Sequence, residues 1–555
     1  MRKWISLLIG ALTVAACVTG PDYRRPELAL PARWSSEVLL SPRERANLAL
    51  WWTYFKDPAL TALVKRAVAH NLNIRLQIAR VREARARLGF AQAEQYPTIG
   101  VQADAFRTYA GTGGMSGFGN QTQGIGGGLG TQGTGGGFST GGGAFDIFSI
   151  GGVLNYEVDL WGRLDRLEEA ARARLFSSIF THDAVRIAVI TDVVTTYFQL
   201  LGAERQLAIA LHTLRSRERS FELERARYEN GATDQLSFRQ AQAELESVRA
   251  QVPPLGGQVR NLESALSVLV GESAREIIQE RRLPRGSLSA LDLPTRMPNL
   301  LPSALIERRP DIRASEAALI AANANVGVVK TQYFPTLNLS GLLGLRAIGI
   351  DNLFSDSADT YTASSSLLTP LFYFGRIQAD VEQARALRQQ VEVQYRRNVQ
   401  TAFREVRDAL TFLNIANQRL SSRRKQIVAL RRTLALARIR YQAGYSAFIE
   451  VLDAERRLLG AELAATRADR DRYVATANLF RALGGGWLGE EVENLPSNKT
   501  TMPANKTPRK IRPVRASSGK RIAQTNKTDT ANVPTQKAPE ATGAKPTRVA
   551  KPVKA

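Results

Sequence analysis

Two stretches of the 555-residue chain, residues 164–230 and 377–443, have the hydrophobic pattern of long α-helices. Neither contains proline, and both are rich in Ala, Leu, Arg, Glu and Gln, which favour helix formation. In the second stretch the apolar residues recur with a mean spacing of about 3.6, the period of a nearly straight helix. They are Ile377, Val381, Ala384, Leu387, Val391, Tyr395, Val399, Ala402, Val406, Ala409, Leu413, Ala416 and Leu420. At 1.5 Å per residue each helix would be about 100 Å long.

Helices of this length need partners that cover their apolar faces. Residues 57–95 and 235–271 are predicted to cover the first long helix, and residues 303–333 and 446–484 the second. Pro253-Pro254 and Gly256-Gly257 are predicted to interrupt the 235–271 helix, because proline lacks a backbone donor and clashes with the preceding turn. Residues 466–470, at the corresponding place in the second copy, contain no such breaker, so the two copies are expected to bend differently.

These long stretches belong to an internal duplication. The segment from Gly162 to Gly271 recurs from Gly375 to Gly484, at a constant offset of 213 in the numbering. The matching features are Trp161-Gly162-Arg163 with Phe374-Gly375-Arg376, Arg227-Tyr228 with Arg440-Tyr441, Gly231 with Gly444, Ala241 with Ala454, and Leu266 with Leu479. Upstream, Tyr96-Pro97-Thr98 matches Phe334-Pro335-Thr336 at an offset of 238. One structural unit is therefore predicted to occur twice.

Four segments alternate apolar and polar residues with the period of a β-strand. The pattern is clearest in residues 153–160 and weaker in 98–107, 336–345 and 361–371. Taken alone, this alternation also suits half-buried strands of a soluble sandwich. Four strands cannot close a membrane barrel, and open edges in hydrocarbon would leave backbone groups unpaired. Several copies of the chain are therefore expected to share one barrel. Three copies would give twelve strands and a lumen wide enough for solutes, whereas two would give a filled interior.

The N-terminus has the pattern of a bacterial secretory signal. Arg2 and Lys3 precede an apolar run that ends at Ala16, and Cys17 is the only cysteine in the chain. The sequence Val14-Ala15-Ala16-Cys17 resembles a lipobox, in which the cysteine is acylated. The alternative is an ordinary buried cysteine in an uncleaved helix. Beyond this signal no run reaches about 18 uncharged apolar residues, so we expect strands to cross the membrane.

The formal charge of +24 would ordinarily suggest a nucleic-acid partner. Residues 496–555, however, hold fourteen Lys or Arg and two acidic residues, with few large apolar side chains, so this tail is predicted to be disordered. Export places the tail away from DNA and RNA. The tail would either bind acidic peptidoglycan or lipid headgroups, or stay solvated without a partner.

Residues 111–143 contain seventeen glycines and no charged residue. They lack the Lys-Ser or Lys-Thr of a phosphate-binding loop. We interpret them as a flexible loop between the first two strands at the cell surface. Partial occlusion of the pore and contact with phage or antibodies are the alternatives.

Several further motifs are spread over the chain. They are Gly20-Pro21-Asp22-Tyr23-Arg24-Arg25-Pro26, Trp51-Trp52, Phe55, Asp57-Pro58, Leu60, Leu63, Arg440-Tyr441-Gln442-Ala443-Gly444, Leu452-Asp453-Ala454-Glu455 and Leu483-Gly484-Gly485-Gly486-Trp487. With these motifs the chain resembles the outer-membrane factor (TolC-like) family of tripartite efflux systems. The resemblance covers about residues 17–490. It is strongest to the lipoprotein subgroup that serves drug and metal exporters of the resistance-nodulation-division type.

The resemblance implies an α+β membrane protein in the outer membrane of a Gram-negative bacterium. It would be a homotrimer with a twelve-strand transmembrane β-barrel, continued by a twelve-helix periplasmic α-barrel and internally duplicated. The chain would divide into a lipoprotein signal peptide (1–16), a lipid-anchored segment (17–56), a first repeat (57–271), a linker (272–302), a second repeat (303–490) and the basic tail (491–555).

The resemblance also assigns two turns at the periplasmic end as tips that contact an adaptor protein. One contains Gly231 and Asp234, and the other contains Gly444 and Tyr445. Glycine at each turn permits the left-handed conformation that ends a helix. Closed-state contacts are assigned to the residues just before the tips, whose partners the sequence does not identify. These residues are Arg227, Tyr228, Arg440 and Tyr441.

An aperture gate is assigned to Ile449 and Asp453, with Leu236 and Gln240 at the repeat positions. Three Asp453 carboxylates near a threefold axis would attract cations and repel one another. The alternative is an aspartate on a helix face, paired with Arg456 or Arg457.

The implied function is the exit channel of a tripartite efflux pump, a passive conduit for drugs, toxic compounds or metal ions. A periplasmic adaptor would open it, and an inner-membrane transporter would supply the energy, because no nucleotide motif is present. A channel for type I protein secretion and a structural lipoprotein without transport are the alternatives. No enzyme activity, cofactor or metal site is predicted, since His70, His182 and His212 have no second ligand at metal spacing.

Overall fold

A computed structural model describes residues 19–28, 42–110, 143–279, 282–288, 291, 293 and 302–486. The predictions for the signal peptide, Cys17 and the basic tail lie outside the described residues. The same holds for the glycine-rich segment apart from Gly143, which begins a strand.

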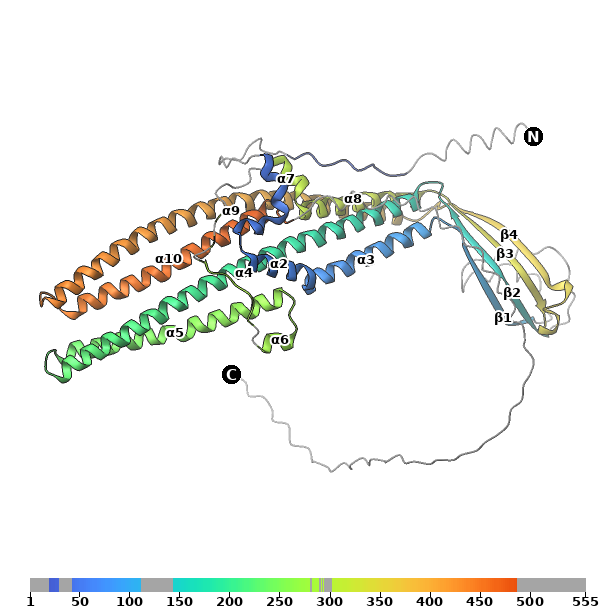
Figure 1. Ribbon diagram of the computed structural model, residues 1–555. Coiled ribbons are helices and arrows are strands. Elements are labelled where there is room, and N and C mark those ends of the chain that lie inside the picture. Colours follow the sequence, from blue (N-terminus) through green and yellow to red (C-terminus); the bar gives the residue numbers. More distant parts are fainter. Residues whose placement is uncertain are drawn as a thin grey trace, which may run out of the picture. The chain divides into compact units, whose positions relative to one another are not determined.

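The four longest helices reproduce the duplication (Figure 1). In the first repeat α4 spans Arg163–Glu229 and α5 spans Gln235–Leu269. In the second, α9 spans Arg376–Gln442 and α10 spans Phe448–Ala482. The paired helices have equal lengths, 67 residues for α4 and α9 and 35 for α5 and α10. The two predicted long helices are confirmed.

Shorter helices flank these four. They are η1 (Pro42–Phe55), α2 (Pro58–His70), α3 (Leu72–Ala93), α6 (Ala274–Ile278), α7 (Pro302–Arg308), α8 (Pro310–Lys330), η4 (Thr331–Tyr333), η5 (Ile350–Asn352) and η6 (Asp356–Ala358). Helices α3 and α5 pack on α4, and α10 packs on both α9 and α4. Helix α8 was expected to cover the second long helix, but it lies against α4 as well as α9. It therefore joins the two repeats.

The predicted interruption of the 235–271 helix is wrong. Helix α5 runs without a break through Pro253 and Pro254. Both prolines are exposed, so water can bind the carbonyl groups that lose their helical partners. Tertiary packing of the apolar face of α5 on α4 outweighs the local preference of these residues.

The four predicted strands form one antiparallel sheet in the order β1-β2-β3-β4. The strands are β1 (Thr98–Ala110), β2 (Gly143–Val158), β3 (Thr336–Ile348) and β4 (Asp359–Leu368). Thr98 lies opposite Asn155 in the first hairpin, and Thr336 lies opposite Leu368 in the second. Adding the sequence offsets of 238 and 213 to the first pair gives the second pair, so the two hairpins share one register.

Strand β2 begins ten residues earlier than the alternation at 153–160 predicted. Gly151 and Gly152 break the alternating pattern, yet they are paired in the sheet. A Cβ atom at Gly151 would lie 2.8 Å from the carbonyl oxygen of Leu343 on β3. Glycine at this position permits a close approach of β2 and β3. In a sequence pattern the same glycine indicates the end of a strand, so the strand was predicted to begin too late.

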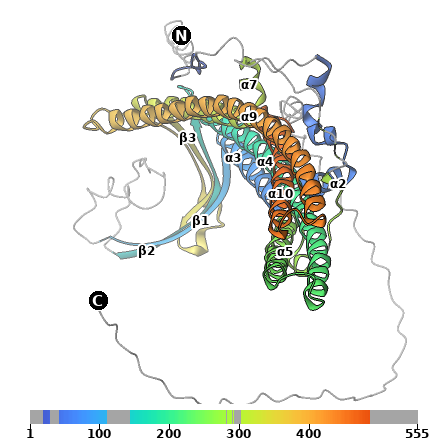
Figure 2. The same cartoon turned by 90° about the vertical axis from the view of Figure 1, so that its left-hand side faces the viewer.

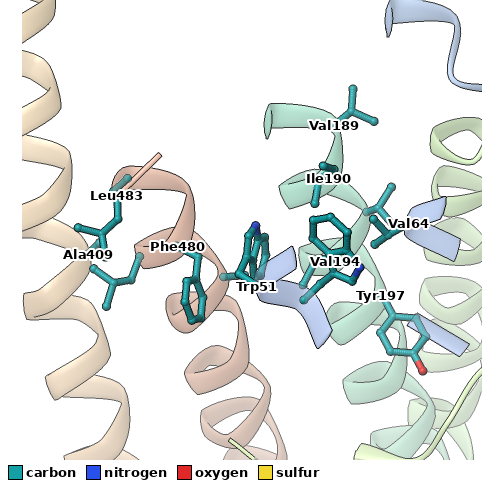
Figure 3. Packing of buried hydrophobic residues seen from close by; sticks show 14 of the residues in the cluster. Trp51, Val64, Val189, Ile190, Val194, Tyr197, Ala409, Phe480 and Leu483 are labelled. Atoms are coloured by element: carbon teal, nitrogen blue, oxygen red, sulfur yellow. The ribbon is translucent and has the colours of Figure 1, made fainter. Parts of the chain in front are cut away.

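The main hydrophobic core lies where the N-terminal segment, α4 and α10 meet (Figure 3). The Trp51 ring is fully buried and stacks on Phe480 with centroids 5.1 Å apart. Phe55 packs edge-on against Phe198, with centroids 4.8 Å apart. The motif around Trp51 that carries the family resemblance is therefore a core motif.

Among the described helices, α4 is long and apolar enough to cross a membrane by length and composition. Its most apolar window has a mean hydropathy of 1.4 and is 56% buried inside the protein. Buried core helices of soluble proteins have the same properties, so this finding is weak evidence for a spanning helix.

Candidate functional site

The α4–α5 and α9–α10 turns lie side by side at the end of the helices away from the sheet (Figure 2). The two turns have the same backbone geometry. Gly231 has φ 72° and Gly444 has φ 77°. Backbone hydrogen bonds from Ala232 to Arg227 (2.7 Å) and from Tyr445 to Arg440 (2.9 Å) close the turns. This is the glycine C-cap expected from the sequence.

The two tips differ in how their second helix begins. Asp234 caps α5, since its carboxylate accepts a hydrogen bond of 2.7 Å from the backbone N–H of Ser237. The corresponding residue before α10 is Ala447, which has no side-chain cap. Beside it, Tyr445 is 80% exposed and offers an aromatic ring at the second tip.

Three side chains connect the two helix pairs just before the tips. The Arg227 Nη1 atom of α4 lies 3.0 Å from Glu224 Oε1 and donates to the Tyr441 hydroxyl of α9 at 3.2 Å. The Tyr441 hydroxyl donates in turn to both carboxylate oxygens of Glu224, at 3.1 Å each. Glu224 is only 2% exposed. We call these three residues the tip link.

Burial and the nearby Glu224 carboxylate raise the pKa of Tyr441 above its ordinary value. The phenol therefore stays protonated and can donate at neutral pH. A buried carboxylate with charged and neutral donors is a strong hydrogen-bonding arrangement. The tip link thus stabilises the contact of α4 with α9.

The other two residues expected in closed-state contacts lie elsewhere. The Tyr228 ring stacks on Phe238 of the same helix pair, with centroids 5.2 Å apart. Arg440 lies 3.9 Å from Glu450, and both side chains are largely exposed. Glu224 was not predicted from the sequence. Its repeat position holds Ala437, so the acidic residue departs from the duplication, and this departure was the signal that could have identified it.

A second group of charged side chains crosses all four long helices behind the tips. Arg217 of α4 forms ion pairs with Glu455 of α10 and, at 3.8 Å, with Glu244 of α5. Arg438 of α9 lies 2.6 Å from Glu455, and Arg456 lies 3.5 Å from Glu244. We call these five residues the charge cluster.

The charge cluster is buried at its centre. Arg217, Glu244 and Glu455 are 4, 7 and 6% exposed. Burial lowers the pKa of the Arg217 guanidinium, and the charge of Glu244 opposes that change. This cluster was not predicted from the sequence. The sequence signal for the cluster was Glu244, which lies on the apolar face of α5 beside the buried Leu245. A charged residue on an apolar face requires a partner.

The residues expected at the aperture are exposed or half-buried in the single chain. Ile449 is 41% and Leu236 is 66% exposed, and Gln240 is half-buried. The Asp453 side chain is 47% exposed and lies 2.9 Å from Arg457, one turn along α10. The pairing with Arg457 that was considered as an alternative therefore occurs within one chain.

In the part of the chain that the structure describes, no group of three or more His, Cys, Asp or Glu residues could hold a metal ion. His182 instead contacts Asp183, with 3.0 Å between the imidazole Nδ1 and the carboxylate.

Comparison with known proteins identifies the family. The family model described as outer membrane efflux protein matches residues 63–272 and 301–485. The cation efflux system protein CusC of Escherichia coli O6:H1 is 31% identical over 479 residues, which are 86% of this chain and 97% of that protein. The probable outer membrane lipoprotein SilC of Salmonella typhimurium is 31% identical over 478 residues, with the same coverage.

Comparison with solved structures supports the same family. The solved structure of the outer-membrane channel OprN is 28% identical, has a TM-score of 0.74, and covers 85% of this chain and 100% of that one. The expected fold class, a subunit of a trimeric channel whose β-barrel continues into an α-barrel, is confirmed by such structures, and so is the expected outer-membrane location. The matched family is a family of channels rather than of enzymes. The chain therefore belongs to the outer membrane efflux protein family and is an outer-membrane exit channel of an efflux pump.

Proposed function

We propose that the channel is held closed at its periplasmic tips by the tip link, and that a periplasmic adaptor opens it by acting on those tips. The observation that carries this proposal is the buried Glu224, which receives donors from both helix pairs. Because this contact joins the two helix pairs beside their tips, it must break before those pairs can move apart there. Energy for transport would come from an inner-membrane transporter.

The two tip turns are the proposed adaptor contact. Gly231 and Gly444 end the long helices, and Asp234 and the exposed Tyr445 present an acidic and an aromatic side chain beside them. An adaptor that binds these residues could compete with the tip link, because the link lies close to each tip along α4 and α9. Binding energy at the tips would then be used to separate α4 from α9.

Ile449 and Asp453 are the proposed aperture ring, with Leu236 and Gln240 at the repeat positions. Their exposure in one chain supports this assignment, because such residues are free to face a central opening. Three half-exposed carboxylates around an axis would favour cations over anions. We propose small molecules as the cargo, with metal cations as one class, which the name of the relative CusC supports.

The lipid anchor is proposed at Cys17. Its support is the position of the residues that follow it. The backbone N–H of Thr19 donates to the carbonyl of Trp161 at 3.0 Å, and Asp22 pairs with Arg166 at 2.8 Å. These contacts hold the segment where the sheet meets the helices. A Cys17→Ala variant that still incorporates labelled palmitate would rule out this anchor.

For the basic tail we propose loose electrostatic binding to peptidoglycan. Its support is compositional, since residues 496–555 hold fourteen basic and two acidic residues. Deletion of residues 491–555 should abolish co-sedimentation with isolated cell wall at low salt. Equal co-sedimentation of the truncated and full-length proteins would contradict the idea.

The direct test of the proposed function is conductance of the purified protein in planar bilayers. We expect discrete channels of low open probability, and a rise in open probability when the cognate adaptor is added. Deletion of the gene should also increase susceptibility of the host to exported compounds. Folded channels whose open probability does not change when the adaptor is added would reject the proposed opening at the tips.

A further inference from the structure

A small groove lies where α8 and α9 meet the sheet. It has a volume of about 250 Å³ and is lined by the C-terminal end of α8, the first turns of α9 and Thr19. Helix α8 ends at Lys330, and Tyr333 and Phe334 lead from there to β3. Pockets that enclose drug-sized molecules measure about 300–1,000 Å³. The groove therefore suits a small chemical group rather than a large ligand.

The polar side chains that line the groove are all hydrogen-bond donors. Lys330 and Arg385 carry positive charges, and Thr19, Tyr333 and Gln378 supply two hydroxyl groups and an amide. Among the described residues of the lining, none is a carboxylate. The residues before Thr19 cannot supply one either, because they include no Asp or Glu. Donors and cations without an acidic residue favour the binding of an anion.

The first repeat has a carboxylate at the corresponding place. Glu168 of α4 accepts hydrogen bonds from the side-chain amides of Gln92 (2.9 Å) and Gln95 (3.0 Å) at the end of α3. Arg172, one turn further along α4, pairs with the same carboxylate at 2.5 Å. An anion that belongs to the chain thus connects α3 to α4 beside the sheet.

The second repeat keeps the donors and lacks the carboxylate. By the offsets of 238 and 213, the repeat position of Glu168 is Val381, an uncharged residue that is 3% exposed. The three donors around Glu168 correspond to Lys330, Tyr333 and Arg385. Because α8 packs on α9 as α3 packs on α4, these side chains surround the same place in the second repeat. The second repeat therefore has the arrangement that holds an anion, without an anion of its own.

Both cations of the groove are available to an external anion. Within the part of the chain that the structure describes, the Lys330 ammonium has no ion pair or hydrogen-bond partner. Arg385 lies 3.5 Å from Glu382, but the two side chains are 56 and 71% exposed. Exposed ion pairs contribute little because water screens them, so Arg385 can turn to a bound anion. Gln378 replaces Asp165 of the first repeat, which removes a second negative charge.

The position of the groove indicates the source of the anion. β3 begins at Thr336, and its sheet contributes to the barrel that crosses the outer membrane. The groove thus lies at the level of the phospholipid head groups. Phe334 and Val381 add apolar surface, and Tyr333 is 49% exposed, as is typical of aromatic residues at a membrane–water interface. An acylated Cys17 would bring hydrocarbon chains to this place but no negative charge.

We propose that the groove binds the phosphate group of an outer-membrane phospholipid, one per copy of the chain. The phosphate takes the place that the Glu168 carboxylate has in the first repeat and accepts hydrogen bonds from Lys330, Tyr333 and Arg385. The apolar part of the lipid lies along Phe334. The bound lipid connects α8 to α9 as Glu168 connects α3 to α4. This site lies at the end of the helices opposite the tips, so it goes beyond the proposed gating.

Native mass spectrometry of the full-length protein in mild detergent measures this binding. The probes are short-chain phosphatidylglycerol, the diacylglycerol with the same chains, and inorganic phosphate. Phosphatidylglycerol should saturate at one molecule per chain. The other two probes should bind at least about tenfold more weakly, because one lacks the charge and the other lacks the apolar contact. Equal binding of the diacylglycerol would show that only the chains are recognised, and equal binding of phosphate would show a free-anion site. Either result would overturn the proposal.

Two substitutions test the cations. Lys330→Gln and Arg385→Gln should each weaken phosphatidylglycerol binding at least about tenfold, because each removes a charged donor. Arg172→Gln is the matched control, since Arg172 holds the repeat position of Arg385 but pairs with Glu168. It should leave the binding unchanged. An unaltered affinity of both groove variants, or an equal loss in the control, would overturn the proposed site.

Val381→Glu tests the replacement of the internal anion directly. It places a carboxylate where the first repeat has Glu168, among donors that match those of the first repeat. The variant should lose phosphatidylglycerol binding. In thermal unfolding, added phosphatidylglycerol should stabilise the wild type but not the variant. A folded Val381→Glu protein that binds the lipid as the wild type does would contradict the proposal. If this variant does not fold, the two cation substitutions decide the question.

Discussion

Replacement of Tyr441 by phenylalanine isolates one component of the tip link. It removes a hydroxyl that contacts both Glu224 oxygens at 3.1 Å and the Arg227 guanidinium at 3.2 Å. The ring remains and can keep its contact with Phe448, at a centroid distance of 5.1 Å. The variant should therefore fold normally and change only the polar connection between α4 and α9.

The expected size follows from the burial of Glu224. Hydrogen bonds to charged groups contribute about 1.5–3 kcal/mol. Since about 1.4 kcal/mol corresponds to a factor of ten, the ratio of open to closed tips should rise about 10- to 150-fold per copy. Because the pKa of Tyr441 is raised, its phenol stays protonated in the closed state and contributes fully below the ordinary tyrosine pKa of about 10. The effect of the substitution should thus be the same at pH 7 and pH 9 and decline as the pH rises through the raised pKa.

Open probability of single channels in planar bilayers is the direct measurement. Tyr228→Phe is the matched control, because Tyr228 occupies the same position in the first repeat but stacks on Phe238 instead of joining the tip link. It should leave open probability unchanged. If Tyr441→Phe channels open no more often than the wild type, or if Tyr228→Phe opens them equally, the tip link does not hold the closed state.

Three further predictions concern the surroundings of the tip link. Arg217→Met should destabilise the fold by about 3–5 kcal/mol in thermal unfolding, because it leaves Glu244 and Glu455 buried with less positive charge; unchanged stability would show that the charge cluster is dispensable. Asp453→Asn should lower the preference for cations over anions in reversal-potential measurements, and an unaltered preference would remove this carboxylate from the aperture. Asp234→Ala should cost about 1 kcal/mol by loss of the α5 cap, detected as faster hydrogen exchange at the first tip only; equal change at both tips would contradict a local role.

The sequence alone determined the elements and their duplication. Helix ends at Gly231 and Gly444 and the proline-free runs before them are local properties, so the matching sequences of the two copies led to matching helix bounds. The positions of the strands followed from the alternation of apolar and polar residues, which is also a local property of the sequence. Family motifs then indicated the function, because the resemblance extends over most of the chain.

Only the tertiary structure decided which residues meet across these elements. The continuity of α5 through Pro253 and the length of β2 depend on packing against other elements, which local propensity does not contain. Arg227 and Tyr441 lie on helices that are far apart in the sequence, and Glu224 between them breaks the repeat. Periodicity specifies the face on which a side chain lies, whereas its partner is set by how two faces are brought together.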